Sequence, residues 1–225
     1  MNHGSSTAFP SLLALSSTWN KQLAEEYGKA LGKEFKDKGA GVILGPGLNM
    51  MRIGLNGRDY ESISGEDPYL GSKIAVSRIN GFLGDNLKKP LTIASCAKHF
   101  AAGSEPVNGL NVSPMDISER TLREIYLKPF KRAVDAGVYS VMAAHNEING
   151  IPSHMHKELL TDVMRDEFEF DGFYVSDWLD INRINVLHKI AKDFKEAIYY
   201  AVDAGMDMNM HGPNSVSYTH LTLPT

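Results

Sequence analysis

A short apolar run that ends in an acid and an indole is the clearest chemical feature of this sequence. Residues 172–176 are rich in aromatic and β-branched side chains, and Asp177 and Trp178 follow directly. Such a run is typical of a buried parallel strand, and α/β folds bind their ligands at the carboxyl ends of strands. Asp177 would place a carboxylate there, beside an indole face that suits a sugar ring. Taken alone, an Asp that merely caps the next helix is an equally good interpretation.

Other apolar runs end in a similar way, which favours a ligand site over a simple cap. The further candidate strands are residues 42–46, 91–97, 138–144 and 205–210. Lys98 and His99 follow the second of these, and His145 follows the third. Because strand ends carrying ionisable residues converge on one pocket in a (β/α) barrel, we expect these side chains to lie close to Asp177.

The segments between the candidate strands have the pattern of amphipathic helices. They cover residues 18–39, 116–134, 156–168 and 192–204. Thr18 is the expected N-cap of the first and Gly39 its end, while Pro129 predicts a kink or break in the second. Strands that alternate with helices predict a parallel sheet with right-handed crossovers. The expected fold class is therefore α/β, with about five strands of an incomplete (β/α)8 TIM-like barrel.

Composition limits the classes of protein to which the chain can belong. The 225 residues are 43% hydrophobic and 22% charged, as in ordinary globular domains. The net charge of −4 and the lack of a basic stripe argue against nucleic acid as a partner. No apolar run approaches the ~20 residues that span a bilayer, so no membrane partner is expected. The single Cys96 excludes an intrachain disulfide.

The strand count bears on completeness. A closed barrel needs eight strands and usually about 250 residues, so residues 1–213 are expected to form part of a barrel. Residues 214–225 differ in character from what precedes them and resemble a translated sequencing adapter. We expect this tail to be non-native and to have no role in function.

An ordered series of short motifs resembles the N-terminal catalytic barrel of family 3 glycoside hydrolases, and within it the β-glucosidase branch. In chain order the motifs lie at Ala8-Phe9-Pro10, 14–19, 44–49, 57–62, 66–70, Lys98-His99-Phe100, 149–153, 159–163, Ser176-Asp177-Trp178 and 204–208. No single motif is decisive, but their common order over roughly residues 7–213 is highly specific. The resemblance implies retaining hydrolysis of terminal non-reducing β-D-glycosides through a covalent glycosyl-enzyme, without a cofactor or a metal.

The resemblance also implies roles for individual residues. Asp177 aligns with the nucleophile. Arg58, Lys98 and His99 align with residues that bind the hydroxyls of the innermost sugar, and Trp178 aligns with one wall of the leaving-group subsite.

Two further residues are expected near this set. Glu61 is the expected supporting partner of a cation such as Lys98. His145 stands where relatives more often carry an aromatic residue, so it either binds the sugar or fills space, and both possibilities stay open.

Three departures from the family pattern restrict the inference. The acid/base of the β-glucosidase branch is usually a Glu on a sandwich-like domain after the barrel, and neither that residue nor the domain is present. Residues 101–108 lack the Asp and His with which another branch, the β-hexosaminidases, supplies its acid/base. The upstream Asp-Gly-Pro segment, which provides a sugar-binding Asp, is absent as well. The isolated chain is therefore expected to hydrolyse unactivated glycosides poorly and, with barrel strands missing, to aggregate.

Other functions remain open from sequence. A β-xylosidase or another β-glycosidase of the same family is one alternative. Different classes are a Schiff-base lyase using Lys98 and a non-catalytic sugar-binding protein. The particular sugar and linkage, the oligomeric state and the localisation are not determined, since a leader could precede residue 1.

The remaining histidines and one glutamate receive structural interpretations. His154 and His156 have ligand-like spacing, but a capping role before the helix at 156–168 is the better interpretation. His188 and His211 are expected to be ordinary surface or loop residues. Glu147 lies near a strand end but is expected to belong to loop structure.

Overall fold

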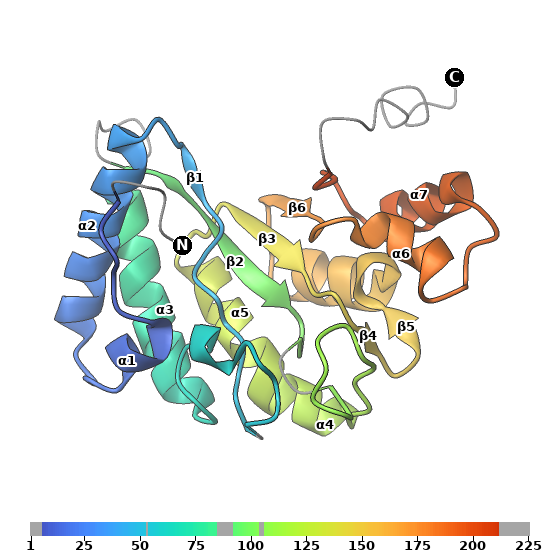
Figure 1. Cartoon of the computed structure of the whole chain (residues 1–225), viewed down its shortest axis with the longest axis horizontal. Helices are drawn as coiled ribbons and strands as arrows, with labels where there is room; N and C mark the ends of the chain where they lie inside the picture. Colours follow the sequence, from blue (N-terminus) through green and yellow to red (C-terminus); the bar gives the residue numbers. More distant parts are fainter. Residues whose placement is uncertain (1–5, 53, 85–91, 104–105, 212–225) are drawn as a thin grey trace.

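The computed structural model shows an α/β fold built around a parallel sheet (Figure 1). It describes residues 6–52, 54–84, 92–103 and 106–211. Leu91, Ser104, Glu105 and the expected tail 214–225 lie outside the described residues. The strands follow one another across the sheet in the order β1 (Val42–Ile43), β2 (Ala94–Phe100), β3 (Ser140–Ala143) and β6 (Phe173–Val175). A two-stranded hairpin, β4 (Glu147–Ile148) and β5 (Ile151–Pro152), stands apart from it.

The register of the sheet brings the carboxyl ends of its strands to one edge. All neighbouring strands pair in parallel, with Ile43 opposite Ser95 and Met142 opposite Val175. The fifth expected strand forms only a single parallel bridge between Val175 and Met208. Lys98 and His99, expected to follow the second strand, are part of β2 itself. The structure thus confirms the expected parallel α/β arrangement, with four strands in the sheet.

Helices cover the sheet and bury its apolar face. The α-helices are α1 (Leu12–Ser16), α2 (Lys21–Asp37), α3 (Pro68–Leu83), α4 (Glu119–Thr121), α5 (Leu127–Asp135), α6 (Asp180–Val186) and α7 (Phe194–Asp203). Short 3-10 turns are η1 (Asp59–Glu61) and η3 (Ser153–Met155), and π-helical segments are η2 (Leu122–Tyr126) and η4 (Glu158–Glu167). In Figure 1, α2, α3 and α5 lie side by side along one side of the sheet. No helix in the described part of the chain has the length and apolar character of a bilayer span.

The helix ends follow the expected chemistry in part. Asn20, rather than Thr18, caps α2, with its side chain accepting a hydrogen bond from the Leu23 N–H. Thr18 instead accepts from the Asn20 N–H and donates to the Leu15 carbonyl, so it closes the turn before the helix. Gly39 has a φ of 81°, a left-handed conformation that glycine adopts without strain, and it ends the helix as expected.

The expected irregularity around Pro129 is present in the form of a π-helical turn. The helix begins after Ser118, whose side chain accepts from the Thr121 N–H. It passes through η2 and continues as α5, which contains Pro129. Proline cannot donate the backbone hydrogen bond of a regular helix. A π turn is a common way to accommodate such an interruption in the series of backbone hydrogen bonds.

Two glycines allow α2 and α3 to approach closely. A Cβ on Gly81 would lie 2.4 Å from the Glu25 carbonyl oxygen and 2.9 Å from the Gly28 Cα. These are backbone atoms, so neither can turn away as a flexible side chain would. The hydrogen side chain at position 81 is therefore required by packing and not by a special φ.

Gly81→Ala is expected to destabilise the protein by about 1–3 kcal/mol, because the two helices must separate to admit the methyl group. Urea unfolding followed by tryptophan fluorescence measures the change. Gly41→Ala is the matched control, since a Cβ there meets nothing within 4 Å. Equal unfolding midpoints for the two variants would show that the helices are not in tight contact at Gly81.

Candidate active site

Three ionisable side chains meet at the carboxyl edge of the sheet. Asp177 follows β6, His145 follows β3 and His99 lies near the end of β2. The Oδ2 atom of Asp177 is 3.0 Å from His145 Nε2 and 3.4 Å from His99 Nε2. All three side chains are largely shielded from solvent, at 11%, 12% and 5% exposure for Asp177, His145 and His99. The structure therefore brings together the residues that the sequence pattern placed at separate strand ends.

The two oxygens of Asp177 have different surroundings. Oδ1 accepts a hydrogen bond of 2.7 Å from the Trp178 backbone N–H, which fixes the carboxylate in place. Oδ2 is buried and accepts no hydrogen bond of acceptable geometry from the described residues. The short contact to His145 Nε2 is thus close in distance but poorly aligned. One oxygen anchors the group, and the other is available to a ligand.

His99 is held as a neutral ring by its neighbours. Its Nδ1 is 3.2 Å from the Oδ1 atom of Asn49, which also accepts the His99 backbone N–H at 2.8 Å. An amide oxygen can only accept, so Nδ1 carries the hydrogen and Nε2 accepts from Arg58 Nη2 at 3.3 Å. Burial, with the added charges of Lys98 and Arg58, lowers the pKa of His99 well below its usual value. His99 is therefore uncharged near neutral pH.

Arg58 and Glu61 form an ion pair beside the histidines. Arg58 Nε and Nη2 donate to the two carboxylate oxygens of Glu61, each at 3.1 Å. Burial alone would raise the pKa of Glu61, but the hydrogen bond and charge of Arg58, helped by the charge of Lys98, outweigh it and lower the pKa. Glu61 was expected to support a cation such as Lys98. Its direct partner is Arg58, because the turn η1 brings residues three apart onto one side.

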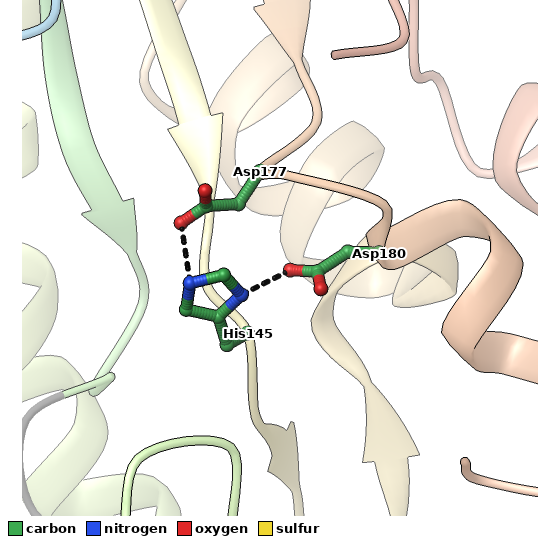
Figure 2. Close-up of side chains that lie close together, drawn as sticks. All are labelled: His145, Asp177 and Asp180. Carbon is green, nitrogen blue, oxygen red and sulfur yellow. Dashed lines mark hydrogen bonds and ion pairs between the residues drawn. The ribbon is translucent and has the colours of Figure 1, made fainter. Parts of the chain in front are cut away.

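His145 lies between two carboxylates, as Figure 2 shows. Its Nδ1 is 2.7 Å from Asp180 Oδ2, on the side of the ring opposite Asp177. Arg183 Nη1 donates to Asp180 Oδ1 at 2.6 Å and lies 2.9 Å from the same Nδ1. Burial tends to raise the pKa of Asp180, but the hydrogen bond to His145 and the nearby cationic groups lower it overall. Neither Asp180 nor Arg183 was predicted from the sequence to belong to the site.

The structure corrects the interpretation of His154. It does not cap the following helix. It lies in η3, almost fully buried, and its Nε2 accepts the backbone N–H of Asp177 at 3.0 Å. Burial lowers the pKa of His154, which keeps the ring neutral and able to accept this hydrogen bond. His154 thereby supports the backbone at Asp177.

His188 lies in the turn after α6, as expected of a loop residue. Its side chain is nevertheless only 7% exposed, and its Nδ1 is 3.0 Å from Glu147 Oε2. Glu147 lies in the short strand β4 rather than in a loop. The pair links this hairpin to the segment after α6.

A small hollow opens beside this cluster. Its lining consists of Asn49, Asn56, Arg58, His99, Gly103, Asn111 and His145. Amide, guanidinium and imidazole groups are suited to the hydroxyls of a neutral polar ligand. Trp178, next to Asp177 in the chain, is 48% exposed and so leaves its indole available for contact. The hollow therefore presents Arg58, His99 and His145 to the polar groups of a ligand at this edge of the sheet.

Comparison with known proteins agrees with this geometry. The profile of the glycosyl hydrolase family 3 N terminal domain matches residues 1–222. The chain belongs to glycosyl hydrolase family 3. It is 38% identical over 211 residues to a β-xylosidase of Formosa agariphila, and 41% identical over 209 residues to a β-glucosidase of Rhizobium radiobacter. Each alignment covers 92% of this chain.

The fold of this family 3 domain is also found in solved structures. A mutant β-glucosidase from Listeria innocua in complex with laminaribiose superposes with a TM-score of 0.91 at 33% identity, covering 98% of this chain and 30% of that one. The parallel sheet with its covering helices is thus part of the TIM-like barrel of the family. The chain spans 29% of the length of the Formosa relative and 23% of the Rhizobium relative.

One group of side chains in this family 3 domain has the composition of a metal site but not its geometry. A nitrogen of His145 and oxygens of Asp177 and Asp180 lie within 4.8 Å of one another. However, the imidazole ring stands between the two carboxylates, and each carboxylate faces a different ring nitrogen (Figure 2). Arg183 also supplies a cation directly at Asp180. The three groups therefore bind each other instead of pointing at a common ion.

Proposed function

We propose that this chain provides the nucleophile and much of the innermost sugar subsite of a retaining β-glycosidase of the β-glucosidase type. Asp177 is the nucleophile. The observation that carries the proposal is the asymmetry of this carboxylate: Oδ1 is fixed by the Trp178 N–H, and the buried Oδ2 lacks a hydrogen bond from the described residues. A nucleophilic oxygen must be positioned yet free to form a bond to carbon.

The reaction follows from that arrangement. Asp177 Oδ2 attacks the anomeric carbon of a terminal β-glycoside, and the bond to the leaving oxygen breaks as that oxygen takes a proton from a general acid. The resulting glycosyl ester on Asp177 is then hydrolysed by water, which gives its proton back to the same group acting as base. Two inversions at carbon retain the β configuration.

The acid/base is proposed to lie outside residues 6–211. A general acid must hold a proton near the working pH. Glu61 and Asp180, which lie close to the cluster, both have lowered pKa values and are engaged with Arg58 and Arg183. Since the curated relatives are more than three times as long, we propose that residues 1–213 are one part of the catalytic barrel and that a further domain supplies the acid/base.

The sugar is proposed to bind through hydroxyl groups at the strand ends. The cationic side chains of Arg58 and Lys98 donate hydrogen bonds to sugar hydroxyls. The neutral ring of His99 presents Nε2 beside Asp177. The exposed face of Trp178 stacks on the leaving group. Glucose is the favoured sugar because the Listeria neighbour is a β-glucosidase in complex with laminaribiose. Xylose is the second candidate, supported by the similarity to the Formosa β-xylosidase.

Covalent trapping tests the proposal. The protein expressed from its complete gene is incubated with a 2-deoxy-2-fluoro β-glucoside that carries an activated leaving group. The fluorine slows hydrolysis of the ester, and the leaving group departs without acid assistance. We expect one adduct per chain, located on Asp177 by peptide mass spectrometry, and the corresponding xyloside identifies the second candidate.

Other results would point elsewhere. Sugar affinity without an adduct from either fluoroglycoside would favour a non-catalytic binding protein. Borohydride reduction of a carbonyl ligand onto Lys98 would favour the Schiff-base lyase. Asp171→Asn is the matched control, because this exposed acid lies six residues before Asp177 and should not alter labelling.

A further inference from the structure

A line of contacts connects helix α6 to the proposed nucleophile. Arg183 reaches Asp180 at 2.6 Å, Asp180 reaches His145 Nδ1 at 2.7 Å, and His145 Nε2 reaches Asp177 Oδ2 at 3.0 Å. The Asp180 side chain is 1% exposed, so protein groups must satisfy it in place of water. Asp180 touches no proposed reacting atom. Its role is therefore to be sought in the side chains that it contacts.

The first contact defines where His145 carries its hydrogen. A carboxylate oxygen can only accept, so a 2.7 Å approach to Nδ1 is favourable when Nδ1 bears the hydrogen. Arg183 donates to the other oxygen of Asp180 and thereby orients the carboxylate toward the ring. Arg183 Nη1 also lies 2.9 Å from His145 Nδ1, but it already donates to Asp180 Oδ1 at 2.6 Å, and the carboxylate contact to Nδ1 is the shorter of the two at 2.7 Å. His154 Nε2, 3.7 Å from Asp180 Oδ2, is a further polar group near this carboxylate. The Asp180 contact therefore favours a hydrogen on Nδ1 of His145.

The consequence appears at the other ring nitrogen. With the hydrogen on Nδ1, Nε2 presents a lone pair 3.0 Å from Asp177 Oδ2. Two acceptors then face each other, which agrees with the absence of a hydrogen bond to Oδ2 from the described residues. A donor brought by the ligand, such as a sugar hydroxyl next to the anomeric carbon, can satisfy Nε2 there. His145 also lines the small hollow beside this cluster.

We infer that Asp180 is a positioning residue that fixes the tautomer and direction of His145, so that His145 Nε2 accepts a hydrogen bond from a substrate hydroxyl beside Asp177. The inference rests on the proposed function and deepens it. It assigns His145 to sugar binding rather than to filling space. It also gives Asp180 and Arg183 a role at the site although neither contacts the reacting atoms.

The tautomer can be measured without any assay of activity. In protein labelled with ¹⁵N-histidine, a long-range ¹H–¹⁵N spectrum distinguishes a ring nitrogen that bears hydrogen from one that does not. We expect His145, assigned by the loss of its signals in His145→Gln, to show a protonated Nδ1 and an unprotonated Nε2. In Asp180→Asn only one amide oxygen remains for two donors, Arg183 and His145, so this pattern should change.

The functional effect is measured by the rate of covalent trapping. Asp180→Asn and His145→Gln are each expected to slow labelling of Asp177 by about 10- to 100-fold, the usual cost of losing a supporting partner. In the double variant the two losses should not multiply, because Asp180 acts through His145. Arg183→Met, a partly exposed position, should give a smaller loss in the same direction.

The outcomes separate the inference from the function on which it rests. Failure to label the unmodified protein would refute the proposed nucleophile. Normal labelling of Asp180→Asn, or losses that multiply in the double variant, would refute the positioning role while leaving the nucleophile intact. Asp203→Asn is the control, since this half-exposed acid on α7 pairs with Lys157 away from the site. Thermal unfolding of each variant identifies any loss that merely reflects unfolding.

Discussion

Asp177→Gly is expected to lower kcat for an aryl β-glucoside by about 10⁴-fold or more, the scale of loss seen when an enzyme loses its nucleophile. No described residue can replace it. The nearest carboxylate along the chain, Asp180, points away toward His145 and Arg183. Binding should be less affected, because the proposed sugar-binding residues Arg58, Lys98 and His99 are unchanged. The kinetic constants of the purified variant give both quantities.

Chemical rescue makes this prediction specific to a nucleophile. In Asp177→Gly the side chain leaves room for azide, which can attack the anomeric carbon from the same face. Because only one inversion then occurs, the expected product is the α-glycosyl azide. Loss of an acid/base would give the β-azide instead. Asp171→Gly, an exposed control in the same segment, should retain normal activity. A β-azide from Asp177→Gly would show that Asp177 is not the nucleophile.

The strand ends were predictable because a parallel strand leaves a strong local pattern. To predict the strand ends before Lys98, His145 and Asp177, it was enough to assume that apolar runs form strands buried on both faces and that the ends of such strands converge. The same pattern failed at residues 205–210, where a single bridge forms in place of a strand. A run of apolar residues indicates that a segment is buried. How many of its residues pair in the sheet depends on the neighbouring strand.

The connections among the site residues were much less predictable. His145 and Asp180 are 35 residues apart, and His154 lies 23 residues before the Asp177 N–H that it accepts. No local pattern encodes such a contact. The available signal was the spacing of Asp180 and Arg183, three residues apart on a helix, which predicts an ion pair but not its place beside a histidine. Only the tertiary arrangement shows which of several polar residues near a strand end are joined.

Stability is expected to fall steeply as the pH decreases below about 6.5, the pKa of an unperturbed histidine. Burial lowers the pKa of both His99 and His154, so the folded protein leaves them neutral where the unfolded chain takes up protons. Proton uptake by the unfolded state alone favours unfolding, at about 1.4 kcal/mol per pH unit for each group. The two together contribute a slope of about 2.7 kcal/mol per pH unit, and above pH 6.5 they contribute none.

Urea unfolding at a series of pH values measures this slope, and His154→Gln provides its control. The Gln side-chain oxygen can still accept the Asp177 N–H, but it cannot titrate. Between roughly pH 6.5 and 5 the slope of this variant should therefore be smaller by the His154 contribution of about 1.4 kcal/mol per pH unit. At lower pH a further loss is expected in both proteins as Glu61 and Asp180, whose pKa values are lowered in the folded state, become protonated. An unchanged slope in His154→Gln would mean that this ring is not buried as a neutral acceptor, and the support that it gives to the Asp177 backbone would have to come from another group.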